Sequence, residues 1–359
     1  MTDEQSLADG AAGIALLHLE TGDMPAAFDA LRRATASGLS TGPGASLFYG
    51  APAIAFVLAS TDHPGLAPAR ALTAEATATI TRHRLDAAHR RIDQGQHPHY
   101  AEYDLICGLT GLGVVLRRTG DQDVLRLVLD YLVRLTEPLD DLPGWWCRNE
   151  PERTQPPADG HANHGMAHGV TGPLALLALT HRDGTTVEGH TGAITRICQW
   201  LDDWQQESNG AIWWPQTLSR ADLDRGAPAQ QRPLLPSWCY GTPGIARAQQ
   251  LAALAIPDHE RGHRAEDALL RCIKDGHQLT TGGLCHGVAG LVQTTWRMVL
   301  NAETPELAAQ LPALAAGIAA LSPATDRGFL DGDTGQALAA RTATQGRPIT
   351  DWDACLLVS

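Results

Sequence analysis

The sequence lacks long hydrophobic runs, because no stretch of roughly eighteen consecutive apolar residues occurs among its 359 residues. It therefore predicts no membrane-spanning helix. The first residues, MTDEQSLADG, are acidic and polar, so we expect no secretory signal. Runs of alternating β-branched residues are also missing, which argues against a large sheet. A helical protein with a large core remains, since 43% of the residues are hydrophobic.

Positive charge is scarce as well. The only lysine is Lys274, and the formal net charge is −13. An acidic chain of this kind is not expected to bind nucleic acid. The charge would suit a basic peptide partner, although a solvated acidic surface explains it without a partner. The seven cysteines are an odd number scattered through the chain. We therefore expect free or metal-bound thiols in a reducing, cytoplasmic compartment rather than a disulfide framework.

What the sequence does contain is a repeated motif, Gly-x-x-Gly followed by an apolar run. A degraded copy begins at Gly50 and has Ala53 in place of the second glycine. The six complete copies begin at Gly10, Gly108, Gly169, Gly241, Gly287 and Gly332. The intervals are uneven, as expected of a closed ring with variable loops rather than a solenoid with one fixed repeat length.

The segments after and between the motifs have the period of amphipathic helices. In DVLRLVLDYLVRL (123–135), one predicted apolar stripe contains Val124, Leu127, Val128 and Leu132. We predict an all-α fold in one domain over residues 1–359, an α/α toroid with seven inner helices inside an outer layer. The paired glycines would allow close backbone approach where each inner helix begins, so the residues beside them would converge on one rim. Two stretches, 138–163 and 207–236, break the rhythm and are either loops over a site or plain connections.

Two consecutive copies of the motif carry metal-ligand residues at equivalent positions. Cys239 stands before Gly241, and Cys285-His286 stands before Gly287. Neighbouring turns of a ring would bring these three side chains together. Two thiolates and one imidazole suit Zn²⁺ and leave a fourth tetrahedral position open, which is typical of a catalytic site. The alternative is two buried structural cysteines and a core histidine.

Two further motif turns carry acid–base residues. His168 stands directly before Gly169, as His286 stands before Gly287, so it should face the same rim as a general acid or base. Asp104, in YDLICGLTG, would fix the tautomer of His168 if it faced the ring, or it could be a helix cap. His164 and His168 have the i,i+4 spacing of a helical metal-binding pair, but the glycines between and after them argue against a regular helix.

Taken together, WCYGTPG, LCHGVAG, NHGMAHGVTG and YDLICGLTG resemble motifs of the lanthionine synthetase C-like family, the lanthipeptide cyclases. The resemblance covers essentially the whole chain, through WDACLL near its end. It implies an α/α toroid of two nested seven-helix layers. The implied reaction adds peptide cysteine thiols to dehydroalanine or dehydrobutyrine and forms (methyl)lanthionine thioether rings. The implied site residues are Cys239, Cys285 and His286 for one Zn²⁺ per chain, and His168, Asp104 and Tyr240 for catalysis.

This chemistry needs an activated thiol and a proton donor. A free thiol has a pKa of roughly 8.5, so it is mostly protonated at neutral pH, and zinc coordination deprotonates it. After the thiolate attacks the β-carbon, the enolate must take a proton at Cα. His168 could supply that proton, which is typically worth about 10²–10⁴ in rate, or could remove the thiol proton instead. The sequence leaves both roles open.

The chain departs from the family pattern at three places. Leu235 stands four residues before Cys239, where the family usually carries an arginine, and Arg232 is a candidate catalytic substitute for it. Ala53 should alter only local packing. The first motif lies so near the start of the chain that the outer helix before it should be missing or short, which would loosen the closure between repeats one and seven.

The leading hypothesis is a stand-alone cyclase that acts on a dehydrated precursor peptide. It would work with a separate dehydratase and a transporter, in the cytoplasm or at the periphery of a membrane-associated complex. One alternative is a non-catalytic scaffold for the precursor, which Leu235 would favour. Another is an enzyme that adds a small free thiol such as glutathione to dehydrated residues. An α/α-barrel glycosidase would need paired rim carboxylates, for which Asp331 and Asp333 are weak candidates beside Asp104.

Overall fold

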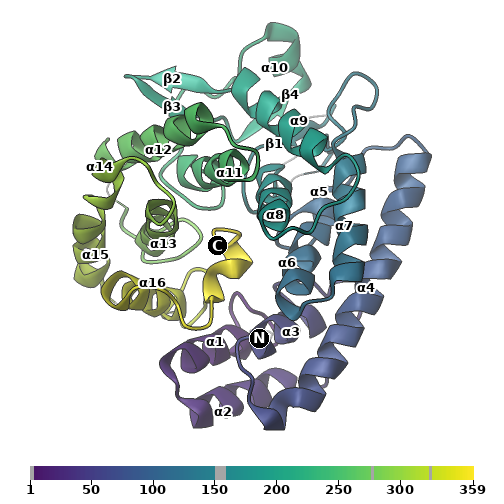
Figure 1. Cartoon of the computed structure of the whole chain (residues 1–359), viewed down its shortest axis with the longest axis vertical. Coiled ribbons are helices and arrows are strands. Elements are labelled where there is room, and N and C mark those ends of the chain that lie inside the picture. Colours follow the sequence, from purple (N-terminus) through teal and green to yellow (C-terminus); the bar gives the residue numbers. More distant parts are fainter. Residues whose placement is uncertain (1–3, 150–158, 276–278, 323–325) are drawn as a thin grey trace.

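The computed structural model describes residues 4–149, 159–275, 279–322 and 326–359. Its inner helices are arranged in a ring (Figure 1). One inner helix follows each motif, and nearly every residue of α3, α8 and α11 is buried. Within the described residues the seven inner helices are α1 (Ala11–Thr21), α3 (Ala51–Leu58), α6 (Leu109–Thr119), α8 (Thr171–Arg182), α11 (Thr242–Ala255), α13 (Val288–Val299) and α16 (Asp333–Gln345).

An outer layer of amphipathic helices surrounds this ring and confirms the predicted α/α toroid. Its members are α2 (Met24–Thr35), α4 (Ala67–Asp93), α7 (Gln122–Leu135), α9 (His190–Asp203), α12 (His259–Lys274), α14 (Pro305–Ala308) and α15 (Leu311–Ala320). The stripe predicted on α7 is wrong at one position, because Leu127 is 43% exposed whereas Val124, Val128 and Leu132 are buried. None of the described helices is long and apolar enough to cross a bilayer.

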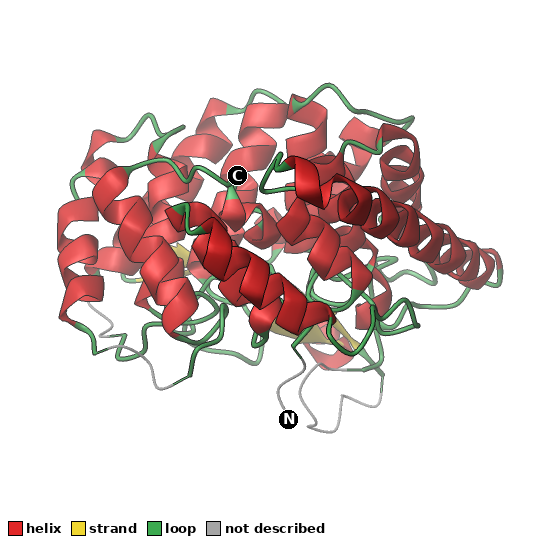
Figure 2. Ribbon diagram, turned by 90° about the horizontal axis from the view of Figure 1, so that it is seen from below, coloured by secondary structure: helices red, strands yellow, loops and turns green. Residues whose placement is uncertain are grey.

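Short strands and short helices lie outside the two helical layers. Strand β1 (His161–Asn163) pairs antiparallel with β4 (Thr217–Ser219), and β2 (Gln206–Ser208) pairs antiparallel with β3 (Ala211–Trp213). Figure 2 shows these strands among loops on the lower side of a molecule built mainly of helices. The remaining short helices are η1 (Pro64–Leu66), α5 (Tyr100–Tyr103), α10 (Arg220–Arg225) and η2 (Trp352–Leu356). The predicted loop 207–236 thus contains β3, β4 and α10, whereas residues 150–158 of the predicted loop 138–163 lie outside the described residues.

The glycines of the motif allow each turn to fold back onto the helix that follows. A Cβ at Gly241 would lie 2.5 Å from the amide nitrogen of Ser237, and a Cβ at Gly244 would lie 2.1 Å from the carbonyl oxygen of Trp238. Both separations are shorter than a side chain tolerates, so only glycine fits at these two positions. The turn at 237–241, which carries Cys239, is therefore held tightly against the start of the helix that follows.

Backbone hydrogen bonds connect these turns around the rim. The amide of each turn donates to a carbonyl of the next, and six of the seven steps between repeats have such a bond. They run from Leu105 to Ala167 (3.1 Å), Ala167 to Cys239 (3.2 Å), Cys239 to Cys285 (3.2 Å), Cys285 to Leu330 (3.1 Å), Leu330 to Ala8 (3.2 Å) and Leu7 to Phe48 (2.9 Å). Among the described residues, no backbone hydrogen bond joins the turn at 46–50 to the turn at 104–108. We call this step the two–three seam.

The ring is closed between repeats one and seven, although no outer helix precedes the first motif in the described part of the chain. Both Phe329 and Leu330 donate backbone hydrogen bonds to the carbonyl of Ala8. Helices α1 and α16 also pack against each other. The expectation of a loosened closure at this step is therefore wrong, because backbone contacts replace the missing helix.

The last described segment fills the middle of the ring (Figure 1). The Trp238 indole donates to the carbonyl of Leu356 over 2.8 Å, and the Arg247 guanidinium donates to the carbonyl of Val358 over 2.9 Å. Buried Asp353 accepts two hydrogen bonds from Arg297, each 2.6 Å long. The inner helices thus pack around residues 352–358, which make both hydrogen bonds and apolar contacts with them, rather than around an open channel.

Candidate metal and catalytic site

Three side chains from two neighbouring turns form a cluster that could hold a metal ion. Cys239 precedes α11, whereas Cys285 and His286 precede α13, and their ligand atoms all lie within 4.8 Å of one another. The Cys239 amide donates to the carbonyl of Cys285 over 3.2 Å, which fixes the two turns side by side. Cys239 is buried and His286 is exposed, so the cluster is closed on the protein side and open toward solvent.

The electrostatics of the cluster favour a thiolate before any metal binds. The hydrogen bond from Cys285 is the largest cause that lowers the pKa of Cys239, to about 5, and His286 and Ser237 contribute further hydrogen bonds. The same Cys285–Cys239 hydrogen bond and burial raise the pKa of Cys285 far above its ordinary value. The hydrogen bond to Cys239 also raises the pKa of His286. Two sulfur donors and one imidazole at this spacing fit tetrahedral Zn²⁺ with one free position.

A histidine–carboxylate pair lies in the turns of repeats three and four. His168 Nδ1 is 2.6 Å from Asp104 Oδ2, and the Asp104 carboxylate is fully buried. The other carboxylate oxygen accepts a hydrogen bond from the Cys107 amide over 2.7 Å. One oxygen of Asp104 thus contacts the turn and the other contacts the His168 ring, so the two side chains lie as close together as the sequence predicted.

The two groups are connected through one backbone hydrogen bond and one aromatic ring. Ala167, the neighbour of His168, donates its amide to the carbonyl of Cys239 over 3.2 Å. The ring of Tyr240, the residue after Cys239, lies 6.1 Å from the ring of His168. The metal-ligand turn and the acid–base turn therefore face one space at the rim.

Comparisons with known proteins identify the family of this chain. The profile of the lanthionine synthetase C-like protein family matches residues 2–339. This chain belongs to the lanthionine synthetase C-like family. The nisin biosynthesis protein NisC of Lactococcus lactis subsp. lactis is 25% identical over 210 residues, which are 56% of this chain and half the length of that relative. A solved nisin cyclase structure shares the fold, with a TM-score of 0.82 at 21% identity, over all of this chain and 93% of that one.

Two site neighbours in this lanthionine synthetase C-like chain were not found from the sequence. The ring of Tyr100 meets that of His168 edge-on at 5.5 Å, although Tyr100 lies outside any motif. Asp331 Oδ1 lies 3.6 Å from His286 Nδ1. Asp331 stands directly before the seventh motif glycine, as His286 stands before Gly287, so its position in the repeat was a usable signal.

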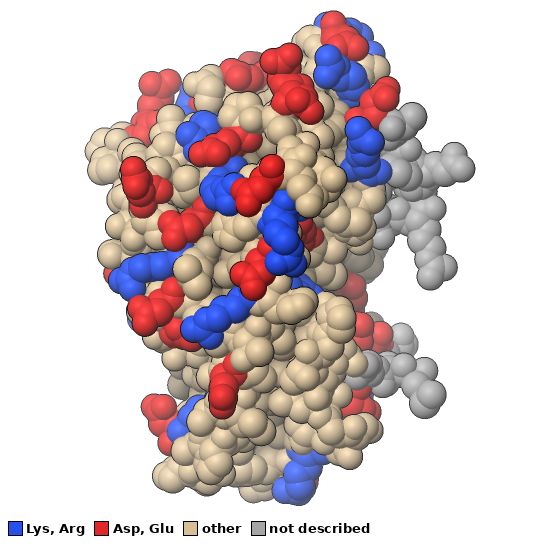
Figure 3. Space-filling model, turned by 90° about the vertical axis from the view of Figure 1, so that its right-hand side faces the viewer, with Lys and Arg blue, Asp and Glu red and all other residues tan. Residues whose placement is uncertain are grey.

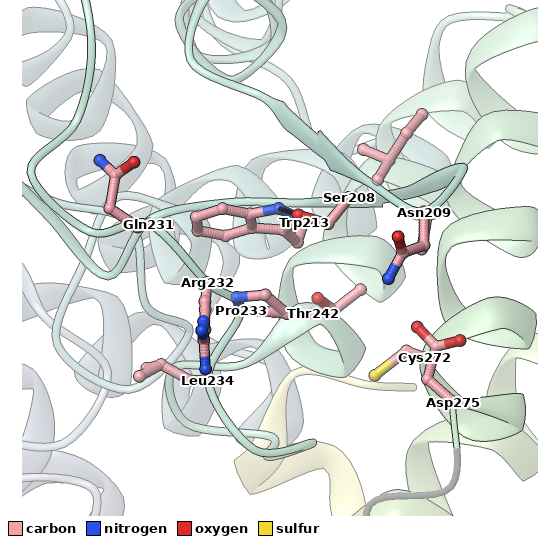
Figure 4. A pocket seen from close by; sticks show the side chains of 12 residues that line it. Ser208, Asn209, Trp213, Gln231, Arg232, Pro233, Leu234, Thr242, Cys272 and Asp275 are labelled. Atoms are coloured by element: carbon pink, nitrogen blue, oxygen red, sulfur yellow. Dashed lines mark hydrogen bonds between the residues drawn. The ribbon is translucent and has the colours of Figure 1, made fainter.

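The structure does not bring Arg232 to the cluster. Arg232 is exposed and lines a cavity of about 640 Å³ beside Trp213, Cys272 and Asp275 (Figure 4). Neither a candidate metal ligand nor His168 is among the described residues that line this cavity. Arg232 lies on an irregular segment beside β3. Leu235, at the usual position of the family arginine, is 59% exposed.

His164 does not form a metal-binding pair with His168. Its Nδ1 donates to the carbonyl of Pro215 and its Nε2 accepts the Trp200 indole hydrogen, each over 2.8 Å. Burial lowers the pKa of His164 to about 4. His164 is therefore a neutral, fully satisfied core histidine that ties α9 and the segment before β4 to this turn.

Proposed function

We propose that this chain is a zinc-dependent lanthipeptide cyclase, which adds cysteine thiols of a dehydrated peptide to dehydroalanine or dehydrobutyrine in the same peptide. The observation that carries the proposal is the meeting of two groups at one rim. One is the donor set of Cys239, Cys285 and His286. The other is His168 backed by a buried carboxylate. When bound, Zn²⁺ would supply Lewis acidity that keeps the peptide cysteine as a thiolate in the open coordination position.

His168 supplies the proton to Cα, the carbon next to the β-carbon that bonds to sulfur. The thiolate sulfur bonds to the β-carbon, and the electrons of the carbon–carbon double bond move toward the adjacent carbonyl. Asp104 stabilises the His168 imidazolium through Nδ1, so Nε2 can donate its proton to Cα. The proton lost by the thiol is thus replaced at Cα, and the product has the same atoms as the substrate.

The aromatic residues shield and orient this proton transfer. The rings of Tyr100 and Tyr240 lie 5.5 Å and 6.1 Å from the His168 ring, and Tyr240 directly follows Cys239 in the chain. We propose Tyr240 as a catalytic residue that hydrogen-bonds the substrate carbonyl as it gains charge. A catalytic role for Arg232 stays a prediction. If Arg232 replaces the family arginine, Arg232→Ala lowers kcat, whereas its position beside Trp213 predicts an unchanged rate.

Metal analysis and thiol counting test the proposal. Protein purified without chelators should contain about one zinc per chain, and Cys239→Ala should lose it. His168→Ala should keep the zinc and fail to close rings. Because ring closure leaves the peptide mass unchanged, it is read as the loss of alkylatable thiols by mass spectrometry.

Each alternative has its own outcome in these assays. Zinc-free wild-type protein that binds the peptide without closing rings would favour the non-catalytic scaffold. Protein that transfers glutathione to the dehydrated residues but leaves the peptide thiols free would favour the small-thiol enzyme. The proposed substrate must already have lost water from serine or threonine, so we propose that a separate dehydratase supplies it in the cytoplasm. A transporter for the product and a peripheral membrane complex belong to the same proposal.

A further inference from the structure

A groove of about 1150 Å³ opens at the two–three seam. One wall is the outer helix α4, the other is the loop at 41–44, and the floor comes from residues 99–107. Pockets for drug-sized molecules are commonly about 300–1000 Å³, so this groove is large enough for a segment of peptide chain.

The α4 wall is largely apolar, although Glu75 and His83 also line it. Leu72 is 62% exposed and lines the groove beside Ala76 and Ile80. The first half of α4, residues 67–81, contains only two charged residues, Arg70 and Glu75. Figure 3 shows the face that carries α4, where charged side chains gather in the upper part and the lower part is mainly uncharged. An exposed leucine in such a groove favours an apolar occupant.

The inner end of the groove is continuous with the catalytic pair. The His99 ring, which lines the groove, lies 4.8 Å from the ring of Tyr100, which in turn meets His168. Cys107 also lines the groove, and its amide donates to Asp104. A chain lying along α4 would therefore lead directly to the site where the ring-forming residues react.

Arg84 holds the two walls in place. Its guanidinium donates to the carbonyls of Pro43 and Cys107, which belong to the loop before α3 and the turn before α6. It thereby bridges the step where the rim lacks a backbone hydrogen bond. Burial lowers the pKa of Arg84, while the charges of Cys107 and Asp104 act in the opposite direction. The groove is therefore preformed, because the bridge does not depend on a bound peptide.

We propose that this groove binds an apolar, non-reacting segment of the peptide substrate while the ring-forming residues occupy the catalytic site. The inference rests on the proposed cyclase function and adds a specificity determinant to it. The occupant is one flexible chain rather than a folded partner, because the groove is bounded by a single helix, a short loop and the edge of the catalytic site.

Two fluorescein-labelled synthetic peptides test the proposal with zinc-loaded protein. Both carry one dehydroalanine and one cysteine, and they differ only in an added segment that is rich in leucine and alanine in one and in serine and glutamine in the other. Wild-type protein should bind the apolar form more tightly in fluorescence anisotropy. Leu72→Asp should weaken that binding roughly tenfold, as expected for one lost leucine contact. Thr79→Arg, which fills the groove from the same helix, should have a similar effect.

Leu127→Asp is the matched control, since Leu127 is an exposed leucine on the outer helix α7 that does not line the groove. It should bind both peptides as the wild type does. Cyclisation by the two groove variants should show a higher KM for the apolar peptide at an unchanged kcat. Equal affinity of wild type and Leu72→Asp for the apolar peptide would overturn the groove assignment. Failure of the wild type to close rings would instead count against the proposed function, and the anisotropy comparison would still decide the groove.

Discussion

Replacing Asp104 with asparagine should slow cyclisation strongly while leaving the fold and the metal in place. In the protein, one Asp104 oxygen meets His168 Nδ1 at 2.6 Å and the other accepts the Cys107 amide at 2.7 Å. An asparagine can keep the second contact with its carbonyl oxygen. Its amide group then faces His168 Nδ1 with hydrogens, which disfavours a protonated Nδ1 and the imidazolium that the reaction needs.

The size of the effect follows from the contact that is lost. A hydrogen bond to a charged group contributes about 1.5–3 kcal/mol, which corresponds to a loss of about 10- to 100-fold in kcat. Asp104→Ala should lose the same rate and also the bond to the Cys107 amide. That variant should therefore unfold at lower urea, with about 1–3 kcal/mol less stability, whereas Asp104→Asn should not.

The assay is the rate at which a dehydrated peptide loses alkylatable thiols, with zinc content and urea unfolding measured on the same samples. For each variant, the reaction rate, the zinc content and the urea midpoint together separate an effect on catalysis from an effect on metal binding or on folding. Wild-type rates in Asp104→Asn would refute a role for the contact between the buried carboxylate and His168 in the reaction. Loss of zinc from Asp104→Asn would show instead that Asp104 acts on the metal turns, which the structure does not support.

Three further predictions test the surrounding structure. Gly290→Ala places a Cβ 1.9 Å from the carbonyl oxygen of Leu284, so it should lower the free energy of unfolding in urea by about 2–3 kcal/mol and displace bound zinc. Gly262→Ala should do neither, because its Cβ would lie 3.7 Å from its nearest neighbour, the Cβ of Ala253. Equal stabilities of the two variants would contradict this packing difference. Asp331→Asn should weaken zinc affinity about 10- to 100-fold in competition with a chromophoric chelator, while Asp333→Asn should not, because only Asp331 lies beside the His286 ring. Burial lowers the pKa of His164 to about 4 in the folded protein, so between this pKa and its ordinary value the unfolded chain binds more protons and the folded state loses stability as the pH decreases. From pH 7 to pH 5 the free energy of unfolding should fall by about 2 kcal/mol through this group. His164→Gln should reduce this dependence of stability on pH, and an equal dependence in the variant and the wild type would count against it.

Much of the ring could be predicted because the sequence repeats. Each Gly-x-x-Gly copy starts an inner helix, so residues at the same place in different copies reach the same rim. That equivalence was enough to bring together Cys239, Cys285 and His286, and to place His168 against Asp104. The catalytic roles of these residues remain proposals, but their proximity follows from the repeat.

The tertiary structure decided whatever depends on segments that do not repeat. Arg232 lies near Cys239 in sequence, yet Cys239 is not among the described residues that line the cavity beside Arg232. Tyr100 contacts His168 from a short helix outside the motifs, and the groove along α4 opens at the one step between repeats where the described residues show no rim hydrogen bond. A repeated motif sets neighbours by symmetry, and therefore by sequence position alone. The course of a single loop is set by the packing around it, which only the folded chain contains.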